Sequence, residues 1–440
     1  MKTKKNGRFW LALVIFSLVG QIAWVVENMY FNVFIYKMFH ASAGDISLMV
    51  GASAVAATLT TIFMGALSDK LGKRRIFMCL GYILWGLSIV AFAFVRLDWL
   101  SRAFGAAAAG AATAVTIVIV LDCVMTFFGS TANDAAYNAW LTDSTDETNR
   151  GAAEGINSMM PLVAILAVFG GFMGFDLDKA ESWTAIYLII GVLVMVIGIL
   201  GFFLIRDVPV KEKNELPYLA TIAYGFRPKV VREHKALYWT LAGFIVFGIA
   251  IQIYMPYLII YYEKTLGMAD YVLIMAPAIL LAAVVTALYG RRYDHWGFRK
   301  SVFPALGMLL GGFLLLYLFP RVIPVEGLAM KIPVFIGSLL MMSGYLCGMA
   351  VFGAKIREET PEGQAGRFQG LRILAQVLVP GVIGPAAGAA ILKGAEVIVG
   401  SDGTTSFLPN ANIFLAALAV TALLMAALWL YFRRKEEKHA

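Results

Sequence analysis

The stretch GALSDKLGKRR at residues 65–75 has a counterpart, GRRYDHWGFRK, at residues 290–300. Glycine, aspartate, glycine and arginine recur at an offset of 225 residues: Gly65 and Gly290, Asp69 and Asp294, Gly72 and Gly297, Arg74 and Arg299. A second pair of stretches, TDETNRGAAEG at 145–155 and TPEGQAGRFQG at 360–370, matches at an offset of 215. Two matched pairs in corresponding places indicate an internal duplication.

The sequence around these stretches is strongly apolar. Of the 440 residues, 60% are hydrophobic and 15% are charged, whereas soluble domains have about 25% charged residues. A bilayer is crossed by about 20 apolar residues in a helix. Twelve segments meet this requirement: 9–36, 46–67, 76–95, 106–130, 156–175, 184–205, 238–260, 271–289, 302–319, 332–354, 373–392 and 412–432. They are too long for barrel strands, so we predict an all-α membrane protein, with the first segment kept as an anchor.

The basic residues predict the orientation in the membrane. The two tails and the loops after spans 2, 4, 6, 8 and 10 hold 28 of the 36 Lys and Arg residues, and the opposite loops hold 8. This asymmetry places both termini in the cytoplasm. The net charge of +8 therefore belongs to a membrane face, and we expect the lipid bilayer as a partner and no nucleic acid.

The spans also limit the chemistry that the protein can perform. No Lys or Arg lies in the middle of a span, which disfavours strongly anionic substrates. The three cysteines lie in apolar spans, and the four histidines lie in loops, tails or span ends. We therefore expect no metal site, no cofactor other than a coupling ion, and no enzymatic nucleophile–base pair.

The connection at 206–237 is the only long cytoplasmic one and divides the spans six and six. We expect an N-terminal bundle at 1–205 and a C-terminal bundle at 238–440. Twelve spans, a basic central connection and G-x-x-x-D-x-x-G-x-R-[RK] after spans 2 and 8 resemble the major facilitator superfamily. That resemblance implies two pseudo-symmetric six-helix bundles that rock to expose a central cavity to each side alternately, in a protein that works as a monomer.

The repeated loop motif also has a physical interpretation of its own. Gly65 and Gly72 permit close helix contact and a tight turn. Asp69 can pair with Arg74 or Arg75, and such a pair can form in one conformation and break in the other. We expect the motif to gate transport in both halves, through Gly65, Asp69, Gly72, Arg74, Gly290, Asp294, Gly297 and Arg299. The alternative is a short loop that is basic only because of the topology.

Span 4 is followed by an unusual polar stretch, GSTANDAAYNAWLTDSTDETNRG, at 129–151. If the helix continues past the apolar run, polar residues recur at every fourth position: Asp122, Thr126, Ser130, Asp134 and Asn138. This spacing keeps them on one drifting face, which must be turned toward protein or water. A carboxylate there can exchange a proton or bind a cation, so Asp134 and Asp122 are candidate coupling residues. The alternatives are a helix-bridging role for Asp134 and a hydrogen bond to a neighbouring helix for Asp122.

The segment STANDAAYNAWLTD also resembles the fourth helix of the glycoside–pentoside–hexuronide cation symporters, the melibiose permease-like branch. The resemblance implies that Asp134 serves both sugar and cation, and that Arg150, with Asp143, belongs to the gating loops. Two features of that branch are missing: the paired aspartates of helix 2 have no counterpart in 46–67, and 373–392 lacks the lysine of helix 11. Protons are therefore favoured over sodium as the coupling ion.

Span 1 holds a second polar cluster in GQIAWVVENMYFN at 20–32. Amides share a face there, with Trp24 beside them and Glu27 one position around. Amides and carboxylates bind sugar hydroxyls, and an aromatic ring stacks on the sugar. Glu27 is a candidate for coupling or substrate binding, with an interfacial role as the alternative. The candidate substrate-binding residues are Gln21, Trp24, Asn28, Asn32, Asn133, Asn138, Gln252, Tyr257 and Gln376.

Together these features predict a secondary active transporter in the cell membrane. We expect proton- or sodium-coupled symport of a small-molecule substrate, a sugar or glycoside, by alternating access. The alternatives are a proton-coupled exporter of drugs or metabolites and a lipid-moving member of the same fold, because the fold does not determine the cargo. GVIGPAAG at 381–388 resembles the Gly-Pro signature of drug–proton antiporters, but it lies in span 11 whereas that signature belongs in helix 5.

Overall fold

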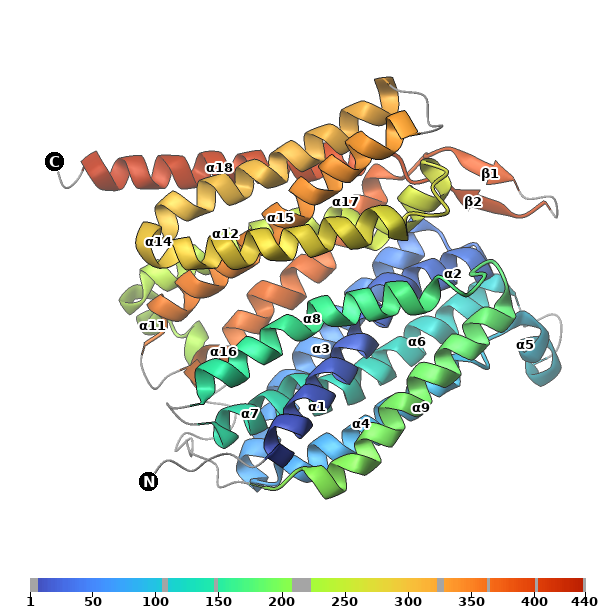
Figure 1. Ribbon diagram of the computed structural model, residues 1–440, viewed down its shortest axis with the longest axis horizontal. Helices are drawn as coiled ribbons and strands as arrows, with labels where there is room; N and C mark the ends of the chain where they lie inside the picture. The colour runs from blue at the N-terminus through green and yellow to red at the C-terminus, as the bar shows by residue number, and fades with distance from the viewer. Residues whose placement is uncertain are drawn as a thin grey trace. The chain divides into compact units, whose positions relative to one another are not determined.

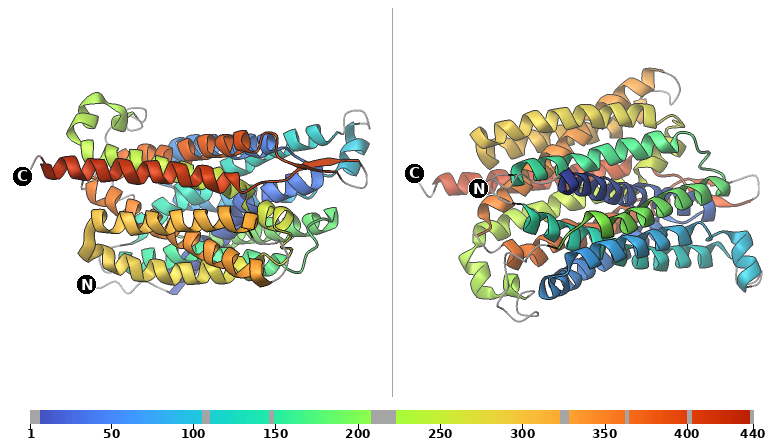
Figure 2. Two further views of the ribbon diagram at one scale, coloured as in Figure 1. Left: turned by 90° about the horizontal axis from the view of Figure 1, so that it is seen from above. Right: turned by 60° about the horizontal axis from the view of Figure 1, so that its bottom comes forward.

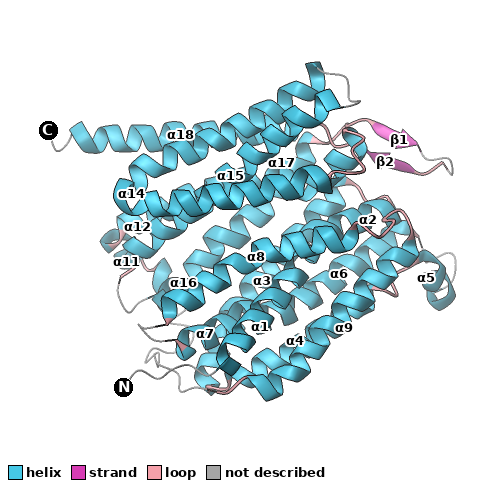
Figure 3. Cartoon of the chain, in the orientation of Figure 1, coloured by secondary structure: helices cyan, strands magenta, loops and turns pink. Residues whose placement is uncertain are grey.

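The computed structural model describes residues 7–104, 110–145, 149–207, 223–322, 328–361, 365–399 and 403–437. Figure 3 shows that these residues are almost entirely helical. The described strands, β1 (Val397–Val399) and β2 (Thr405–Phe407), form a short antiparallel hairpin in which Ile398 pairs with Ser406.

Twelve helical segments in the described residues are long and apolar enough to cross a membrane. They are Gly7–Phe39, Ala43–Leu71, Arg74–Phe92, Ala111–Ser144, Gly151–Phe172, Ala180–Leu204, Lys235–Thr265, Val272–Tyr293, His295–Val322, Ala329–Glu359, Gly370–Ile391 and Asn412–Arg434. Each overlaps one of the twelve segments expected from hydropathy, which confirms the prediction. A helix bonds its backbone groups internally, as the lipid interior requires.

The chain forms two compact units, one of Met1–Asp45 with Ala52–Ile222 and the other of Ile46–Gly51 with Ala223–Ala440. The first unit contains the following elements (Figure 1): α1 (Gly7–Val25), η1 (Val26–Tyr30), α2 (Phe31–Phe39), most of α3 (Ala43–Leu71), α4 (Arg74–Phe92), α5 (Leu97–Phe104), α6 (Ala111–Gly129), η2 (Ser130–Tyr137), α7 (Asn138–Ser144), α8 (Arg150–Phe172) and α9 (Ala180–Leu204). The short helix α5 lies at one end of this unit in every view (Figure 2).

Apart from the Ile46–Gly51 part of α3, the second unit runs from η3 to α18 (Asn412–Glu437), and its first α-helix is α11 (Pro228–Glu233). Its elements are η3 (Tyr224–Phe226), α11, α12 (Lys235–Tyr254), η4 (Met255–Tyr257), α13 (Leu258–Ile260), η5 (Tyr261–Thr265), α14 (Val272–Val322), α15 (Leu328–Glu359), α16 (Ala365–Ile373), η6 (Leu374–Leu378), α17 (Val379–Ile391), β1, β2 and α18. Gly297, with φ 67° and ψ 179°, divides α14 into two spans.

In the first unit, α4 and α9 pack closely because glycines face each other. A Cβ atom added to Gly86 would lie 2.4 Å from the carbonyl oxygen of Gly191. A Cβ atom on Gly191 would lie 2.7 Å from the carbonyl oxygen of Gly86. Small residues at such contacts let membrane helices approach closely, so the sequence itself determines this packing distance.

The variant Gly86→Ala should therefore destabilise the protein by about 1–3 kcal/mol, because its methyl group requires the two backbones to separate. The measurement is unfolding of the purified protein in detergent. Gly171→Ala on α8 is the matched control, since its Cβ would meet nothing within 4 Å. If both variants unfold like the wild type, the close α4–α9 contact is contradicted.

Candidate transport site

Span 4 is a continuous helical segment made of α6, the π-helical η2 and α7. This confirms that the helix continues beyond the apolar run. In an α-helix, residues four apart drift by about 40° around the axis. A π-helical turn has i→i+5 bonds and more residues per turn, so it turns the polar row from Asp122 to Asn138 back toward its starting face. Such turns are rare and frequently found at functional sites.

Glu27 lies in a second π-helical turn, η1, within span 1. Its side chain is buried, and Oε1 accepts hydrogen bonds from Ser53 Oγ of α3 at 2.7 Å and from Thr126 Oγ1 of α6 at 2.9 Å. The two hydroxyl oxygens lie 2.8 Å apart. Three spans therefore meet at one carboxyl group, and we call these three residues the carboxyl–hydroxyl cluster.

Asp122 lies one turn before Thr126 on α6 and is only 2% exposed. Glu27 Oε2 and Asp122 Oδ1 are buried and have no hydrogen-bond partner within the described part of the chain. The two side chains interact electrostatically, and the interaction is repulsive when both are ionised. Buried polar atoms without partners are uncommon in proteins. A proton, a cation or a substrate hydroxyl could satisfy these two.

Asp134 is less buried than Glu27 and Asp122. Its Oδ2 accepts a hydrogen bond from Ser130 Oγ, one turn earlier, at 2.9 Å. Asp134 also interacts electrostatically with Glu27. The three acidic side chains proposed from the sequence thus belong to one electrostatic group within the first unit.

The amide of Asn133 connects spans 1, 3 and 4. Its Nδ2 donates to Tyr82 Oη at 2.7 Å, and its Oδ1 accepts from Trp24 Nε1 at 3.4 Å. Tyr82 Oη in turn donates to the carbonyl of Phe16 at 2.7 Å. A Cβ on Gly20 would lie 2.1 Å from Asn133 Nδ2 and 2.6 Å from Tyr82 Oη, so a larger residue there would displace these two side chains. Asn133 therefore aligns helices in this structure.

The other candidate amides of the first unit differ in exposure. Asn28 and Asn138 are exposed, and each donates to a carbonyl four residues earlier, at 2.8 Å and 3.0 Å. Asn32 is 1% exposed and donates to the carbonyl of Asn28 at 3.2 Å, while its Oδ1 is buried without a partner in the described region. Gln21 is half-exposed on α1.

The candidates in the second unit occupy separate places. Tyr257 is fully buried and donates its hydroxyl to the carbonyl of Pro385 at 3.1 Å. Gln252 is half-exposed and packs against Gly384, where an added Cβ would lie 2.3 Å from Gln252 Cβ. Gln376 is exposed in the π-helical η6. Tyr257 therefore holds α17 in place, whereas the two glutamines remain accessible.

The loop motif after span 2 is organised by Arg74, whose side chain is 3% exposed. Its guanidinium forms ion pairs with Asp69 and, through Nε at 3.2 Å, with Asp143 at the end of span 4. Nη1 also donates to Ser68 Oγ. Gly72 ends α3 with φ 62°, a conformation that favours glycine. Arg74 thus links the ends of spans 2, 3 and 4.

The second copy of the motif is only partly comparable. A Cβ on Gly65 would make an ordinary contact, 3.8 Å from Ala135 Cβ, and one on Gly290 would meet nothing within 4 Å. The guanidinium carbon of Arg299 lies 5.6 Å from the ring centroid of Phe432. The side chains of Asp294 and Arg150 lie outside the described residues.

Sequence reasoning did not select Ser53 or Tyr82 as site residues. A serine in an apolar span carries a weak signal, because it can also bond within its own helix. The sequence does not distinguish Tyr82 from the other aromatic residues of span 3.

Across the described part of the chain, no group of three or more His, Cys, Asp or Glu residues could hold a metal ion.

Comparison with known proteins shows which family the chain belongs to. The sequence profile of the Major Facilitator Superfamily matches residues 9–385. The chain belongs to the major facilitator superfamily. It is therefore a multi-pass membrane protein of a family of secondary transporters, not of enzymes. A second profile, the LPXTG cell wall anchor motif, matches residues 410–438, which cover span 12 and its basic end.

Two relatives are described as sugar efflux transporters. Sugar efflux transporter B of Salmonella typhimurium is 25% identical over 202 residues, 45% of this chain and 47% of that protein. Sugar efflux transporter A of Dickeya chrysanthemi is 23% identical over 283 residues, 64% of this chain and 67% of that protein. The chain thus spans about half the length of the first relative. These matches support the superfamily and do not single out the melibiose permease-like branch.

The fold also matches that of solved transporters. A bacterial homolog of the human lysosomal transporter Spinster, in an inward-facing and unoccupied conformation, superposes with a TM-score of 0.69. The match covers 98% of each chain at 16% sequence identity. It establishes the twelve-helix major facilitator fold and carries no information about the substrate.

The two carboxylates that share Arg74 provide a test of this site. Asp143→Asn should lower the free energy of unfolding by about 3 kcal/mol, because Arg74 and Asp143 are both buried. Asp69→Asn should cost less than about 1 kcal/mol, because the Asp69 side chain is 48% exposed. Chemical unfolding in detergent gives both values, and equal losses would refute the buried Arg74–Asp143 pair.

Proposed function

We propose that this transporter couples the movement of protons to that of a sugar or glycoside. The observation that carries the proposal is the carboxyl–hydroxyl cluster of Glu27, Ser53 and Thr126. Its three oxygens lie 2.7, 2.9 and 2.8 Å from one another. Each contact is a hydrogen bond only if a proton lies in it, and the two hydroxyls supply two protons. A proton on Glu27 Oε1 supplies the third: Oε1 then donates to one hydroxyl and accepts from the other, while the two hydroxyls bond to each other.

Proton loss from Glu27 would change the packing of three spans. Without its proton, the cluster has three close oxygen contacts and two donors, so one contact becomes repulsive. Ser53 and Thr126 lie on spans 2 and 4, so relief of that repulsion moves one span relative to another. Asp122 and Asp134 lie within electrostatic range of Glu27 and can receive the proton or respond to its loss. This is how a proton can bias a conformational equilibrium.

A sugar is the proposed substrate for chemical reasons. Span 1 presents Trp24 and the exposed amide of Asn28, and the exposed Asn138 adds a second amide from span 4. Rings and amides of this kind bind the apolar face and the hydroxyls of sugars. The two relatives are described as sugar efflux transporters, which favours the same class of solute.

Protons are proposed over sodium as the coupling ion. The melibiose permease-like branch uses paired aspartates in span 2, and the described residues of span 2 near Glu27 include no acidic group.

In the proposed cycle, the six-helix halves at 1–205 and 238–440 rock as two bodies within a monomer, and the Arg74 ion pairs form and break. Symport into the cell remains our first proposal for direction, and sodium remains an outcome of the test.

Export is a second candidate. The observation in its favour is that both relatives are described as efflux transporters. The same carboxylates would then exchange a proton moving inward for a sugar moving outward. The two directions differ in the sign of proton movement that accompanies the sugar.

A binding panel tests the proposal on the purified protein. Thermal stability in detergent is measured against mono- and disaccharides and hydrophobic cations, with and without sodium, at two pH values. We expect one glycoside to stabilise the protein, with a dependence on pH and none on sodium. Stabilisation by hydrophobic cations alone would reject the sugar and favour a drug exporter.

Coupling is tested by Glu27→Gln, with Asp134→Asn as a second variant. Glutamine has nearly the size of glutamate, and its amide protons do not dissociate. Glu27→Gln therefore mimics the protonated state of the cluster. Accumulation of sugar driven by a pH gradient in proteoliposomes should fall to the level of empty vesicles, while exchange of sugar between equal pools continues. Glu233→Gln, on the exposed α11, is the control and should accumulate normally. Normal accumulation by both site variants would remove the coupling role.

A further inference from the structure

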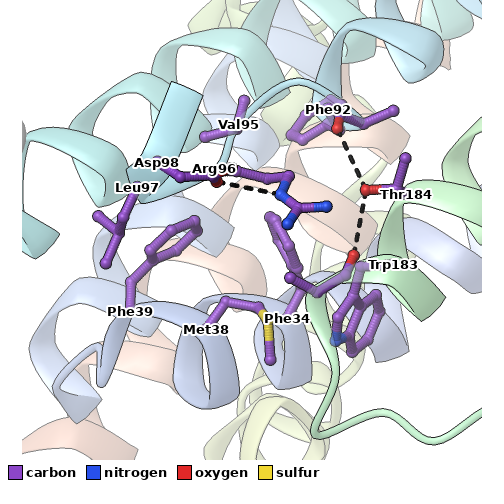
Figure 4. A pocket seen from close by; sticks show the side chains of 12 residues that line it. Phe34, Met38, Phe39, Phe92, Val95, Arg96, Leu97, Asp98, Trp183 and Thr184 are labelled. Atoms are coloured by element: carbon purple, nitrogen blue, oxygen red, sulfur yellow. Dashed lines mark hydrogen bonds and ion pairs between the residues drawn. The ribbon is translucent and has the colours of Figure 1, made fainter. Parts of the chain in front are cut away.

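A pocket of about 450 Å³ lies at the end of the first unit, among α2, α4, α5 and α9. Figure 4 shows its aromatic walls, formed by Phe34, Phe39 and Trp183, with the side chain of Arg96 extending between them. Its volume is within the range of about 300–1,000 Å³ that small-molecule sites occupy. No part of the proposed transport mechanism uses this pocket.

Two charged residues line the pocket, Arg96 and Asp98, and a third, Glu181, lies beside it and pairs with Arg96. Arg96 Nε donates to Asp98 Oδ1 at 3.1 Å, and Nη2 donates to Glu181 Oε1 at 3.0 Å. Burial lowers the pKa of Arg96, but its hydrogen bonds to the two carboxylates outweigh this and raise it above its usual value. A guanidinium has five N–H donors, so Arg96 keeps donors for a ligand. Arg96 is thus a cation that pairs with two anions, Asp98 in the pocket lining and Glu181 beside it.

The pocket lies at the ends of three candidate membrane spans. The span helices α2 and α4 end beside it at Phe39 and Phe92, and α9 begins there at Ala180. Phe94 and Trp99, the sequence neighbours of the lining residues Ala93 and Asp98, are 48% and 47% exposed and contact each other with ring centroids 5.2 Å apart. Exposed aromatic side chains of this kind are typical of the membrane interface.

An apolar track leads from the pocket along α9. Thr184 lines the pocket, and Leu188 and Val192 follow it at spacings of four, on the same side of the helix. Leu188 is 38% exposed and Val192 is 50% exposed. A ligand with its polar end in the pocket can therefore lay an acyl chain along this row.

We propose that this pocket binds an aminophospholipid, with the phosphate on Arg96 and the primary ammonium between Asp98 and Glu181. Charge complementarity selects this ligand class. An anionic phospholipid without an ammonium would place negative charge against the two carboxylates. A trimethylammonium headgroup has no N–H to donate to them. The acyl chains lie along the Leu188–Val192 row.

Native mass spectrometry of the full chain in detergent, titrated with phosphatidylethanolamine, phosphatidylcholine or phosphatidylglycerol of equal chain length, tests the assignment. We expect phosphatidylethanolamine to bind with the highest affinity. Arg96→Gln should weaken that binding about tenfold, the effect of one lost charge-assisted hydrogen bond. Glu181→Gln changes an exposed carboxylate and should remove the preference for phosphatidylethanolamine over phosphatidylcholine.

The matched control is Arg102→Gln, an exposed arginine that does not line the pocket and that lies on α5, the short helix that begins directly after Arg96. It should bind phosphatidylethanolamine like the wild type. Free phosphoethanolamine is the arm that separates a lipid from a soluble ligand, and saturation by it at the same concentration would overturn the lipid assignment. Equal binding of the three lipids, or an unchanged preference in Glu181→Gln, would also overturn it.

Discussion

The need of buried oxygens for hydrogen-bond partners determines how the first unit is built. Lipid supplies none, so a polar side chain inside a span bonds within its own helix, bonds to another span, or is left unsatisfied. Glu27 Oε1 accepts hydrogen bonds from Ser53 and Thr126, whereas Glu27 Oε2 and Asp122 Oδ1 have no hydrogen-bond partner in the described part of the chain. The two hydrogen bonds to Oε1 join three helices, and the two unpartnered oxygens favour the binding of a proton or a cation.

Span 4 connects this cluster to the loop motif. The same continuous helical segment carries Thr126 at the cluster, Asp134 further along, and Asp143 in the ion pair with Arg74. In the proposed mechanism, a shift of span 4 that relieves repulsion at Glu27 would also act on the Arg74 ion pairs and so link ion binding to gating. The π-helical η2 lies between Thr126 and Asp143 on this span.

Hydropathy alone predicted the twelve spans, because the thickness of the bilayer requires long apolar helices. The spacing of Asp122, Thr126 and Asp134 predicted a continuous polar helix, and the loop motif indicated Asp69 and Arg74 as partners. Sequence could not show that Ser53 faces Glu27 or that Asn133 bonds to Tyr82, because the rotation of one helix against another depends on packing across the whole unit. The π-helical turns were equally invisible, since no residue type specifies them.

Proton movement accompanying sugar flux tests the central claim most directly. Proteoliposomes containing a trapped pH indicator would receive the sugar identified by binding, without any imposed gradient. We predict a change of internal pH in the wild type, acid for symport or alkaline for exchange, and none in Glu27→Gln. Sugar entry into wild-type vesicles at constant internal pH would contradict proton coupling through the carboxyl–hydroxyl cluster.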